Sequence, residues 1–277
     1  MQFPREIEEL KERLTLPALL AEKAPYLLKF AEREEEFSAI LRLRYKVFNQ
    51  EQGKGLAESH AAGCDRDEFD PFCSHLYVWD QEKKAVAGTY RIQLGPLAAH
   101  TGLGFYSERE FAFSGLDAYA PMAVETGRSC VDPAYRNGSV IALLWSGFSI
   151  IMRRTRLRYL FGCVSLEETA PEAGWLLYDH FFREGKKASD ITAAPREKYL
   201  LPRPDDAGCR AFLEEKGGDV RKLIPPLFKG YLRMGAKILG EPAFDPDFGS
   251  IDFPILLDVA KLPESYVKHF HVAEVKK

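Results

Sequence analysis

The sequence predicts an α/β (α+β) fold with a mixed, mostly antiparallel sheet flanked by helices. Apolar residues alternate with period two in residues 74–80 and 85–94, which predicts an antiparallel hairpin. The sequence also predicts a β–α–β crossover. It consists of a strand-like run at 123–131, a polar turn, a long apolar helix and a second apolar run at 158–166. Because such a connection joins parallel strands, we expect parallel central strands within the sheet.

Composition and charge limit the classes of protein that fit. The chain has 277 residues, 46% of them hydrophobic, which is enough to bury a large core. Its 38 basic and 41 acidic residues give a net charge of −3, so we expect no nucleic-acid partner. The five cysteines form no CxxC pair and the first residues are charged, which predicts a reduced, cytoplasmic protein without a signal peptide.

Residues 1–36 are predicted to form an N-terminal helical arm. Charged and leucine-rich positions alternate at near-helical spacing, with Leu10 and Leu14 on one face. We interpret the arm as cover for the core. Peripheral docking on a membrane or on a partner is the alternative, although anionic lipid would repel the acidic run at 32–36.

Residues 37–49 form the next predicted helix, with Ile40 and Leu43 on its apolar side. Arg44 falls on or beside that side. A guanidinium is tolerated in an apolar environment only when a carboxylate or another acceptor pairs with it. The sequence therefore predicts an acceptor for Arg44 elsewhere in the chain.

Residues 50–72 are predicted to be a loop that carries Asp65, Asp67 and Asp70. These carboxylates could bind a cationic amine, pair with Arg44, or form a solvated acidic turn. A zinc site is disfavoured, because the histidines and cysteines here lack the ligand spacing of compact zinc sites. Those residues are His60, Cys64, Cys73 and His75. We predict no bound metal.

Two features follow the loop. Arg91 lies inside the second strand of the predicted hairpin. The long connection at 95–121 is rich in Gly, Phe and Tyr, with a short helix predicted at 108–113. Connections of this length often line a functional site.

The turn between the strand at 123–131 and the helix predicted at 139–154 has the composition of a phosphate-binding turn. It contains Arg136, Asn137, Gly138 and Ser139. A helix start exposes backbone N–H groups and the positive end of the helix dipole, which suits an anion. The alternative is that Gly138 and Ser139 only cap the helix.

The remaining chain is predicted to alternate helices and strands. These elements are a helix at 171–183, a strand starting within 195–201, helices at 205–216 and 222–239, and a last strand at 253–259. We find no repeat and no low-complexity linker, so we expect a single domain over 1–277. Its parts are the arm at 1–36, a core at 37–201, a helical insertion at 202–252, and a last strand with tail at 253–277.

Ordered motifs along the chain resemble those of known acyltransferases. One series of motifs resembles that of the acyl-homoserine-lactone synthases of the GNAT superfamily. It consists of the RYKVF run from Arg44 to Phe48, the aspartates at 65–70, Arg91, and the ExxR pair of Glu125 and Arg128. The chain is more similar to the ornithine lipid N-acyltransferases, a hemolysin-like GNAT family. This similarity lies in the segment ETGRSCVDPAYR, the strand LFGCVSL and a C-terminal run ending in FGSIDF. This resemblance implies splayed parallel central strands around an acyl groove.

The resemblance also implies a reaction. Such enzymes move a 3-hydroxy fatty acyl group from acyl carrier protein to the α-amine of ornithine, which gives a lyso-ornithine lipid, and they hold no permanent cofactor. The donor is an acyl-phosphopantetheine thioester, on acyl carrier protein or as acyl-CoA. Its phosphate is expected at Arg136, Asn137, Gly138, Ser139 and Val140, beside the strand that ends at Val131.

The same resemblance assigns roles to individual side chains. Glu125 is the expected base for the amine, and the alternative is that it only pairs with an arginine. Arg128 or Arg91 could hold the acceptor's carboxylate, and Asp67 or Asp70 its side-chain amine. Arg44 and Phe48 complete the predicted acceptor site. Tyr178 is a candidate acid for the leaving thiolate, although an aromatic residue on an apolar helix face is more often part of the core.

Arginines that follow the phosphate turn favour a carrier protein as the donor. They are Arg136 at the turn and Arg153, Arg154, Arg156 and Arg158 near the end of the helix. A basic cluster would steer a strongly acidic carrier protein, whereas the alternative is that it only complements the helix dipole.

Three functions remain open from the sequence. The first is the ornithine N-acyltransferase described above. The second is an N-acyltransferase for another amino acid or an acyl-homoserine-lactone-type synthase, and the third is a non-catalytic module with the GNAT fold. Lactone formation is the weaker choice, because the tryptophan expected soon after the RYKVF run is absent.

Overall fold

The computed structural model describes residues 16–263 and residue 266. They fall into two compact units. The first unit takes its described residues from Met1–Gly104, Met122–Arg158 and Glu264–Lys277, and the second from Phe105–Pro121 and Tyr159–Pro263. Among these residues, none of the helices combines the length and the hydrophobicity that a membrane span requires.

The first unit contains an antiparallel run of five strands in the order β1-β2-β3-β4-β6. Their bounds are Leu19–Lys23 for β1, Tyr26–Phe30 for β2, Ser74–Asp80 for β3, Ala85–Leu94 for β4 and Ala123–Val131 for β6. The period-two runs predicted as a hairpin are β3 and β4, so that prediction is confirmed. The predicted strand at 123–131 is also confirmed.

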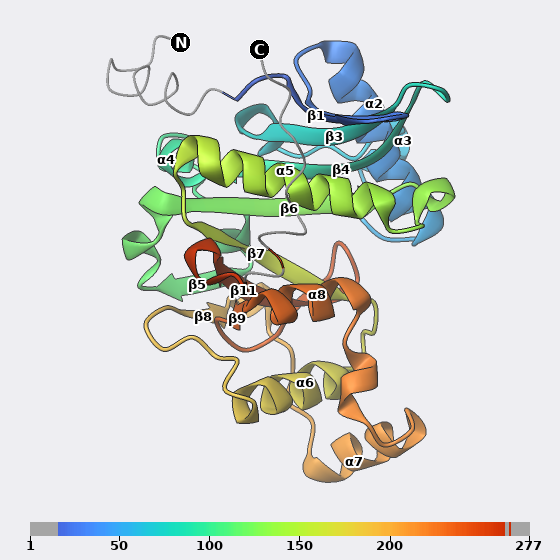
Figure 1. Cartoon of the computed structure of the whole chain (residues 1–277). Coiled ribbons are helices and arrows are strands. Elements are labelled where there is room, and N and C mark those ends of the chain that lie inside the picture. Colours follow the sequence, from blue (N-terminus) through green and yellow to red (C-terminus); the bar gives the residue numbers. More distant parts are fainter. Residues whose placement is uncertain (1–15, 264–265, 267–277) are drawn as a thin grey trace. The chain divides into compact units, whose positions relative to one another are not determined.

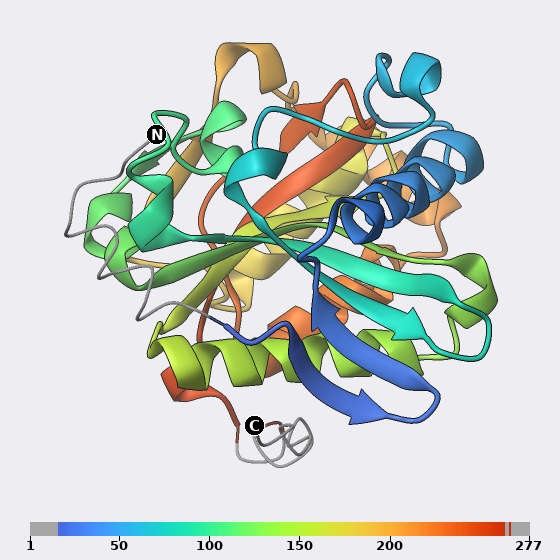
Figure 2. The ribbon, with the colours of Figure 1, turned by 90° about the horizontal axis from the view of Figure 1, so that it is seen from above.

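Helices of the first unit cover opposite faces of these strands (Figures 1 and 2). They are α2 at Glu34–Tyr45, α5 at Ser139–Thr155, and the short α3 at Ser59–Ala62 and α4 at Gly95–Ala98. Tyr90 on β4 packs edge-on against Phe148 of α5, with ring centroids 4.9 Å apart. Since successive strand residues point to opposite faces, Arg91 points away from α5, toward the face that α2 covers.

The N-terminal arm differs from its prediction where the structure describes it. Residues 19–30 form the β1–β2 hairpin instead of a helix, and β2 pairs with β3 along its whole length. Pro25 cannot continue a helix, and pairing with β3 gives the segment hydrogen bonds and burial that its helical charge pattern does not reveal. The part of the predicted arm before residue 16 lies outside the described residues.

The second unit is built on the antiparallel pair of β7 and β11, which register from Leu166 opposite Ile251 to Tyr159 opposite Asp258. Its strands are β5 at Phe111–Ser114, β7 at Tyr159–Leu166, β8 at Thr192–Pro195, β9 at Lys237–Ile238, β10 at Ala243–Asp245 and β11 at Ser250–Asp258. β9 and β10 pair with β11, and β5 pairs with β8. The predicted strands at 158–166 and 253–259 are therefore confirmed.

Three helices belong to the second unit: α6 at Pro171–Arg183, α7 at Asp206–Glu215 and α8 at Pro226–Met234. The rings of Phe181 on α6, Phe228 on α8 and Phe253 on β11 pack together, with centroids 5.1–5.8 Å apart. All three side chains are fully buried. This aromatic cluster fixes α6 and α8 on the strand β11.

Three boundaries in the second unit were predicted wrongly. Residues 111–114 form β5 rather than part of a helix, and the strand expected within 195–201 is β8, which ends at Pro195. The helix predicted at 222–239 ends at Met234, because Gly235 takes a left-handed conformation (φ +98°) that closes it. The splayed, parallel arrangement of 123–131 with 158–166 stays a prediction.

Candidate active site

A buried network of charges lies on the α2 face of the first unit. Arg44, at the end of α2, is 1% exposed. Its Nε donates to Asp65 Oδ1 at 2.7 Å and its Nη1 donates to Asp70 Oδ1 at 2.7 Å, and Nη2 also donates to Asp65. The prediction that Arg44 has an acceptor elsewhere in the chain is therefore confirmed, and of the alternatives for the acidic loop the structure shows the pairing with Arg44.

Two more arginines close the network around Asp67. Arg91 Nη1 on β4 lies 2.6 Å and 2.7 Å from the two oxygens of Asp67, and Arg128 Nη2 on β6 donates to Asp67 Oδ2 at 2.9 Å. Arg91 Nη1 also lies 3.2 Å from Asp70 Oδ1. Three guanidiniums, one each from α2, β4 and β6, thus bind the three carboxylates of one loop.

A β-bulge turns Arg128 into this network. Arg91 is opposite Gly127 and Thr89 is opposite Cys130, so β6 carries one residue more than β4 over this interval. Arg128 has φ +48°, a left-handed conformation that costs a non-glycine residue energy. A bulge takes backbone groups out of the ladder and redirects side chains, and both effects occur frequently beside active sites.

The network holds the carboxylates of Asp67 and Asp70 in the ionised form. Burial alone would raise the pKa of Asp67, but the charges of Arg91 and Arg128 outweigh burial and lower it. In the same way, Arg44 and Arg91 hold the pKa of Asp70 well below its usual range despite burial. Breaking either set of pairs would leave a charge buried without compensation, which is strongly destabilising.

Two neighbouring groups are neutral at pH 7. Burial lowers the pKa of His75 to about 4, and burial raises the pKa of Cys73 to about 12. The pKa of Cys73 is also lowered by the charge of Arg91 and raised by that of Glu125. Cys73, Arg91 and Glu125 therefore belong to one local environment.

Glu125 lies on β6 directly opposite Gln93 of β4. Gln93 and Arg91 are two residues apart on β4, so Glu125, Gln93 and Arg91 share one face of the strands. Glu125 is 4% exposed and Gln93 is 3% exposed. A buried carboxylate in this position is suited to accept a proton, as predicted for the base, and that role stays a prediction.

The predicted acceptor-binding residues are members of this network or lie beside it. Arg44, Asp67, Asp70, Arg91 and Arg128 are brought together as expected, but their charged groups bind one another. Phe48 is also buried, in the π-helix at Lys46–Glu51 that follows α2. This arrangement supports a structural role for Arg44 and Asp70 beside the predicted substrate-binding role.

The predicted phosphate turn lies at the start of α5. Gly138 has φ +88°, and Asn137 Oδ1 accepts hydrogen bonds from the backbone N–H of Ser139 at 3.1 Å and from its hydroxyl. Val140 is the second residue of α5 and is buried. The helix has 17 residues, so its dipole is fully developed at this end.

Two ion pairs join this turn to the π-helix at Lys46–Glu51. Lys46 Nζ lies 2.6 Å from Asp132 Oδ2, and Arg136 binds both carboxylate oxygens of Glu51 at 2.5 and 2.8 Å. Arg136 Nε also donates to the carbonyl of Val131 at 3.0 Å. The contact with Glu51, which holds the arginine expected at the donor phosphate, could not be predicted from the sequence.

Arginines near the end of α5 lie at the surface. Arg153, Arg154, Arg156 and Arg158 are all exposed. Arg156 follows the helix in a left-handed conformation, with φ +58°. Their exposure fits both predicted roles, steering of an acidic partner and stabilisation of the helix dipole.

Tyr178 belongs to α6 in the second unit and is half-buried. Its ring packs edge-on against Trp175 at 5.7 Å, and Lys187 Nζ lies 3.4 Å from its hydroxyl. Its role as the acid stays a prediction.

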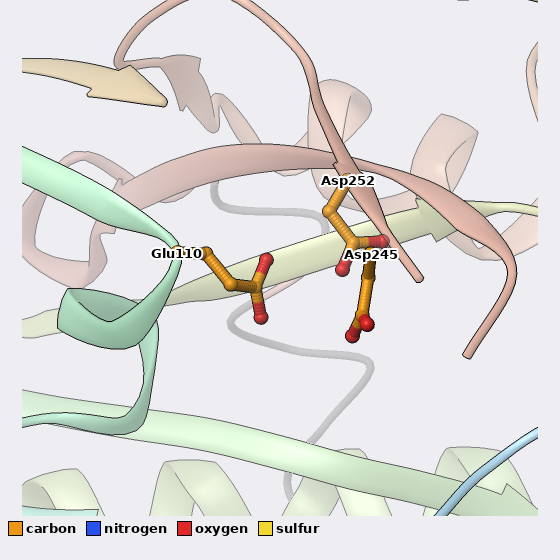
Figure 3. Close-up of side chains that lie close together, drawn as sticks. All are labelled: Glu110, Asp245 and Asp252. Atoms are coloured by element: carbon orange, nitrogen blue, oxygen red, sulfur yellow. The ribbon is translucent and has the colours of Figure 1, made fainter. Parts of the chain in front are cut away.

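The second unit also contains a buried acidic cluster that the sequence did not predict. Glu110, Asp245 and Asp252 each bring a carboxylate oxygen within 4.8 Å of the others, and Figure 3 shows them converging from separate segments. Asp245 accepts backbone N–H groups of Asp247 and Phe248, and Ser250 donates to Asp252. These contacts come from the protein itself, and we assign no metal to the cluster.

Replacement of Asp252 by asparagine is expected to stabilise the second unit at neutral pH. Burial, with the charge of Asp245 beside it, raises the pKa of Asp252 to about 6, so the folded state prefers the protonated form. The stability that this preference contributes is present below pH ~4 and is lost as the pH rises to ~6, roughly 3 kcal/mol at most. Asparagine keeps the side-chain oxygen that accepts the hydrogen bond from the Ser250 hydroxyl, and it has no carboxyl group to titrate.

The measurement is thermal unfolding of both proteins between pH 4 and pH 8. We expect the difference in melting temperature to favour the asparagine variant increasingly as the pH rises. The matched control is Asp247→Asn, at an exposed position two residues after Asp245, which should keep the pH dependence of the unsubstituted protein. Identical pH profiles for Asp252→Asn and the unsubstituted chain would show that Asp252 does not titrate in this range.

Comparison with known proteins identifies the class. Residues 43–146, which span the network, the bulge and the turn before α5, match the family model of the acetyltransferase (GNAT) domain. The chain is thus an acyltransferase with a GNAT domain.

The family follows from comparison over most of the chain. An L-ornithine N(alpha)-acyltransferase of Brucella abortus (strain 2308) is 31% identical over 257 residues, which cover 88% of this chain and 88% of the relative. This chain belongs to the family of the L-ornithine N(alpha)-acyltransferases. A glycine N(alpha)-acyltransferase of Bacteroides thetaiotaomicron is 26% identical, over 68% of this chain and 64% of that protein.

A solved structure of BjaI, a CoA-dependent acyl-homoserine lactone synthase with SAM and isopentyl-CoA, superimposes with a TM-score of 0.45. It is 14% identical in sequence, and the match covers 86% of this chain and 81% of BjaI.

Proposed function

We propose that this acyltransferase moves a 3-hydroxy fatty acyl group from acyl carrier protein to the α-amine of ornithine, which produces a lyso-ornithine lipid. The observation that carries the proposal is 31% identity over 88% of the chain to a protein named for ornithine N(alpha)-acylation. A second candidate acceptor is glycine, because a relative at 26% identity is named for glycine N(alpha)-acylation.

In the proposed reaction, the neutral amine nitrogen attacks the carbonyl carbon of the thioester. The C–N bond of the amide forms and the C–S bond breaks, so that no covalent enzyme intermediate is needed. Glu125 accepts a proton from the amine, directly or through a water molecule, and the leaving thiolate takes up a proton from water. Backbone N–H groups of β6 at the bulge stabilise the negative oxygen of the tetrahedral intermediate.

The donor's phosphate is proposed to bind at the start of α5. Backbone N–H groups at the helix N-terminus and the side chain of Arg136 provide donors and positive charge for it. Arg136 would leave its contact with Glu51, at least in part, to reach the phosphate. Because the product is a lipid, the proposal includes peripheral contact with the cytoplasmic membrane surface.

Removal of Arg136 tests the donor assignment. We expect Arg136→Ala to lower kcat/KM for acyl carrier protein roughly 10- to 100-fold, because a bidentate charged contact is worth about that much. The matched variant is Glu51→Gln. It breaks the same ion pair but keeps the guanidinium, so it should keep or increase donor kcat/KM.

The measurement is ornithine acylation with acyl carrier protein and with acyl-CoA, each at low and high salt. High salt should weaken the carrier-protein reaction more, since surface arginines raise association rates only while their charge is unscreened. A double change of Arg153 and Arg154 to alanine should have a milder effect of the same kind. Equal activity with both donors, unaffected by salt and by Arg136→Ala, would contradict the carrier-protein assignment.

A further inference from the structure

Gln93 has a buried oxygen that the fold does not use. Its Nε2 donates to the carbonyl of Gly104 at 2.9 Å, while its Oε1 is buried and has no hydrogen-bond partner among residues 16–263 and 266. The contact with Gly104 fixes the orientation of the amide, since a flip would place two carbonyl oxygens against each other. A buried acceptor without a partner destabilises the protein unless a ligand satisfies it.

The position of Gln93 indicates which ligand this is. Gln93 and Glu125 are directly opposite on β4 and β6, so their Cβ atoms are about 5 Å apart on the same face. Gln93 Oε1 and the Glu125 carboxylate are both acceptors. A group that donates hydrogen bonds in several directions, such as an ammonium with three N–H bonds, can bind both of them at once.

The charges of this face favour a cation. The guanidiniums of the network balance its carboxylates one to one, and His75 and Cys73 are neutral at pH 7 for the reasons given above. Glu125 adds a carboxylate directly beside the unsatisfied Gln93 oxygen. A buried carboxylate next to a neutral acceptor favours a ligand that donates hydrogen bonds and carries a positive charge.

We propose that Gln93 is an acceptor-binding residue, whose Oε1 binds the α-ammonium of the amino-acid acceptor together with Glu125; this inference rests on the proposed function. The two oxygens orient the ammonium so that one N–H bond points at the Glu125 carboxylate. That proton moves to Glu125, which releases it to solvent, and the remaining N–H bonds keep the neutral amine in place through Gln93. The nitrogen lone pair is then available for the thioester. Glu125 is free of protons again and accepts the second proton, which the nitrogen loses when the amide forms.

Two substitutions separate this role from a structural one. Gln93→Met removes both the donor to Gly104 and the acceptor, whereas Gln93→Glu removes only the donor and keeps an acceptor beside Glu125. We expect Gln93→Met to raise KM for ornithine about 10-fold or more, because a hydrogen bond to a charged group is lost, with KM for the acyl donor unchanged. Gln93→Glu should keep KM for ornithine within about threefold but lower kcat, since a second carboxylate holds the ammonium in its charged form.

The experiment measures kcat and both KM values with the full chain, ornithine and an acyl carrier protein thioester. The inference is overturned if Gln93→Met leaves KM for ornithine unchanged, or if both variants raise it equally, which would indicate that only the contact with Gly104 matters. If Gln93→Met does not fold, a rise of more than 10-fold in KM for ornithine with Gln93→Glu overturns the inference by itself. Failure of the unsubstituted chain to acylate ornithine would instead contradict the proposed function.

Discussion

Glu125→Gln is expected to lower kcat for ornithine acylation about 10²- to 10⁴-fold while the protein remains folded. Glutamine has the size and hydrogen-bonding oxygen of glutamate but cannot accept the amine proton, and loss of a general base typically costs this factor. Glu125 is 4% exposed and lies opposite Gln93, so the substitution leaves its surroundings filled. KM for the acyl donor should change little, since donor binding does not require the base.

The measurement is steady-state acylation together with thermal unfolding of the same samples. Glu82→Gln is the matched control, because Glu82 lies in the exposed turn between β3 and β4 and should leave kcat unchanged. A folded Glu125→Gln protein with near-normal turnover at neutral pH would exclude Glu125 as the base. A variant that fails to fold would favour the alternative, in which Glu125 mainly stabilises the arginines around it.

Arg44→Met is expected to destabilise the first unit by about 3–5 kcal/mol. The side chain of Arg44 is 1% exposed and binds Asp65 and Asp70, and its removal leaves both carboxylates buried without their main counter-charge. Methionine retains much of the side-chain volume, so the decrease in the free energy of unfolding measures the effect of the missing charge rather than that of a cavity.

Urea unfolding measures this effect. Arg42→Met is the matched control, since Arg42 lies on the same helix but is exposed, and its replacement should change the free energy of unfolding by no more than about 0.5 kcal/mol. Equal stability of the two variants would mean that water or a rearranged Arg91 compensates the aspartates. In that case the network could not be described as a structural element.

Elements with strong local patterns could be predicted from the sequence. Each such pattern lies within one continuous stretch of sequence. Examples are the period-two runs of β3 and β4 and the long apolar helix α5, and the structure confirms all three. The hairpin β1–β2 and the strand β5 could not be predicted in this way. They depend on pairing with β3 and with β8, and burial at these edges outweighs the local propensity of the chain.

In the candidate site, too, some features could be predicted from the sequence and others could not. An arginine on an apolar helix face requires an acceptor, so a partner for Arg44 could be predicted, and the loop at 65–70 was one candidate for it. Which aspartate binds which arginine depends on the β6 bulge at Arg128, and the sequence contains no periodic signal for a bulge. Gln93 was missed because an amide within a strand is an ordinary residue until its buried, unsatisfied oxygen is seen.

The pairs that were missed join segments that are distant in the sequence. Glu51 and Arg136 are 85 residues apart, and nothing in either segment indicates the other. Glu110, Asp245 and Asp252 also come from separate elements and meet only in the folded second unit. A single sequence offers no means of detecting such pairs, because each member looks like a solvated charge.

The most direct test of the account is the product formed by the purified chain from 3-hydroxyacyl carrier protein and an equimolar mixture of ornithine and glycine. We predict an amide on the α-nitrogen of ornithine, identified by fragmentation in the mass spectrometer, with one free carrier thiol released for each amide formed. Thiol release without acyl-ornithine, acylation of the side-chain amine, or preferential acylation of glycine would contradict it.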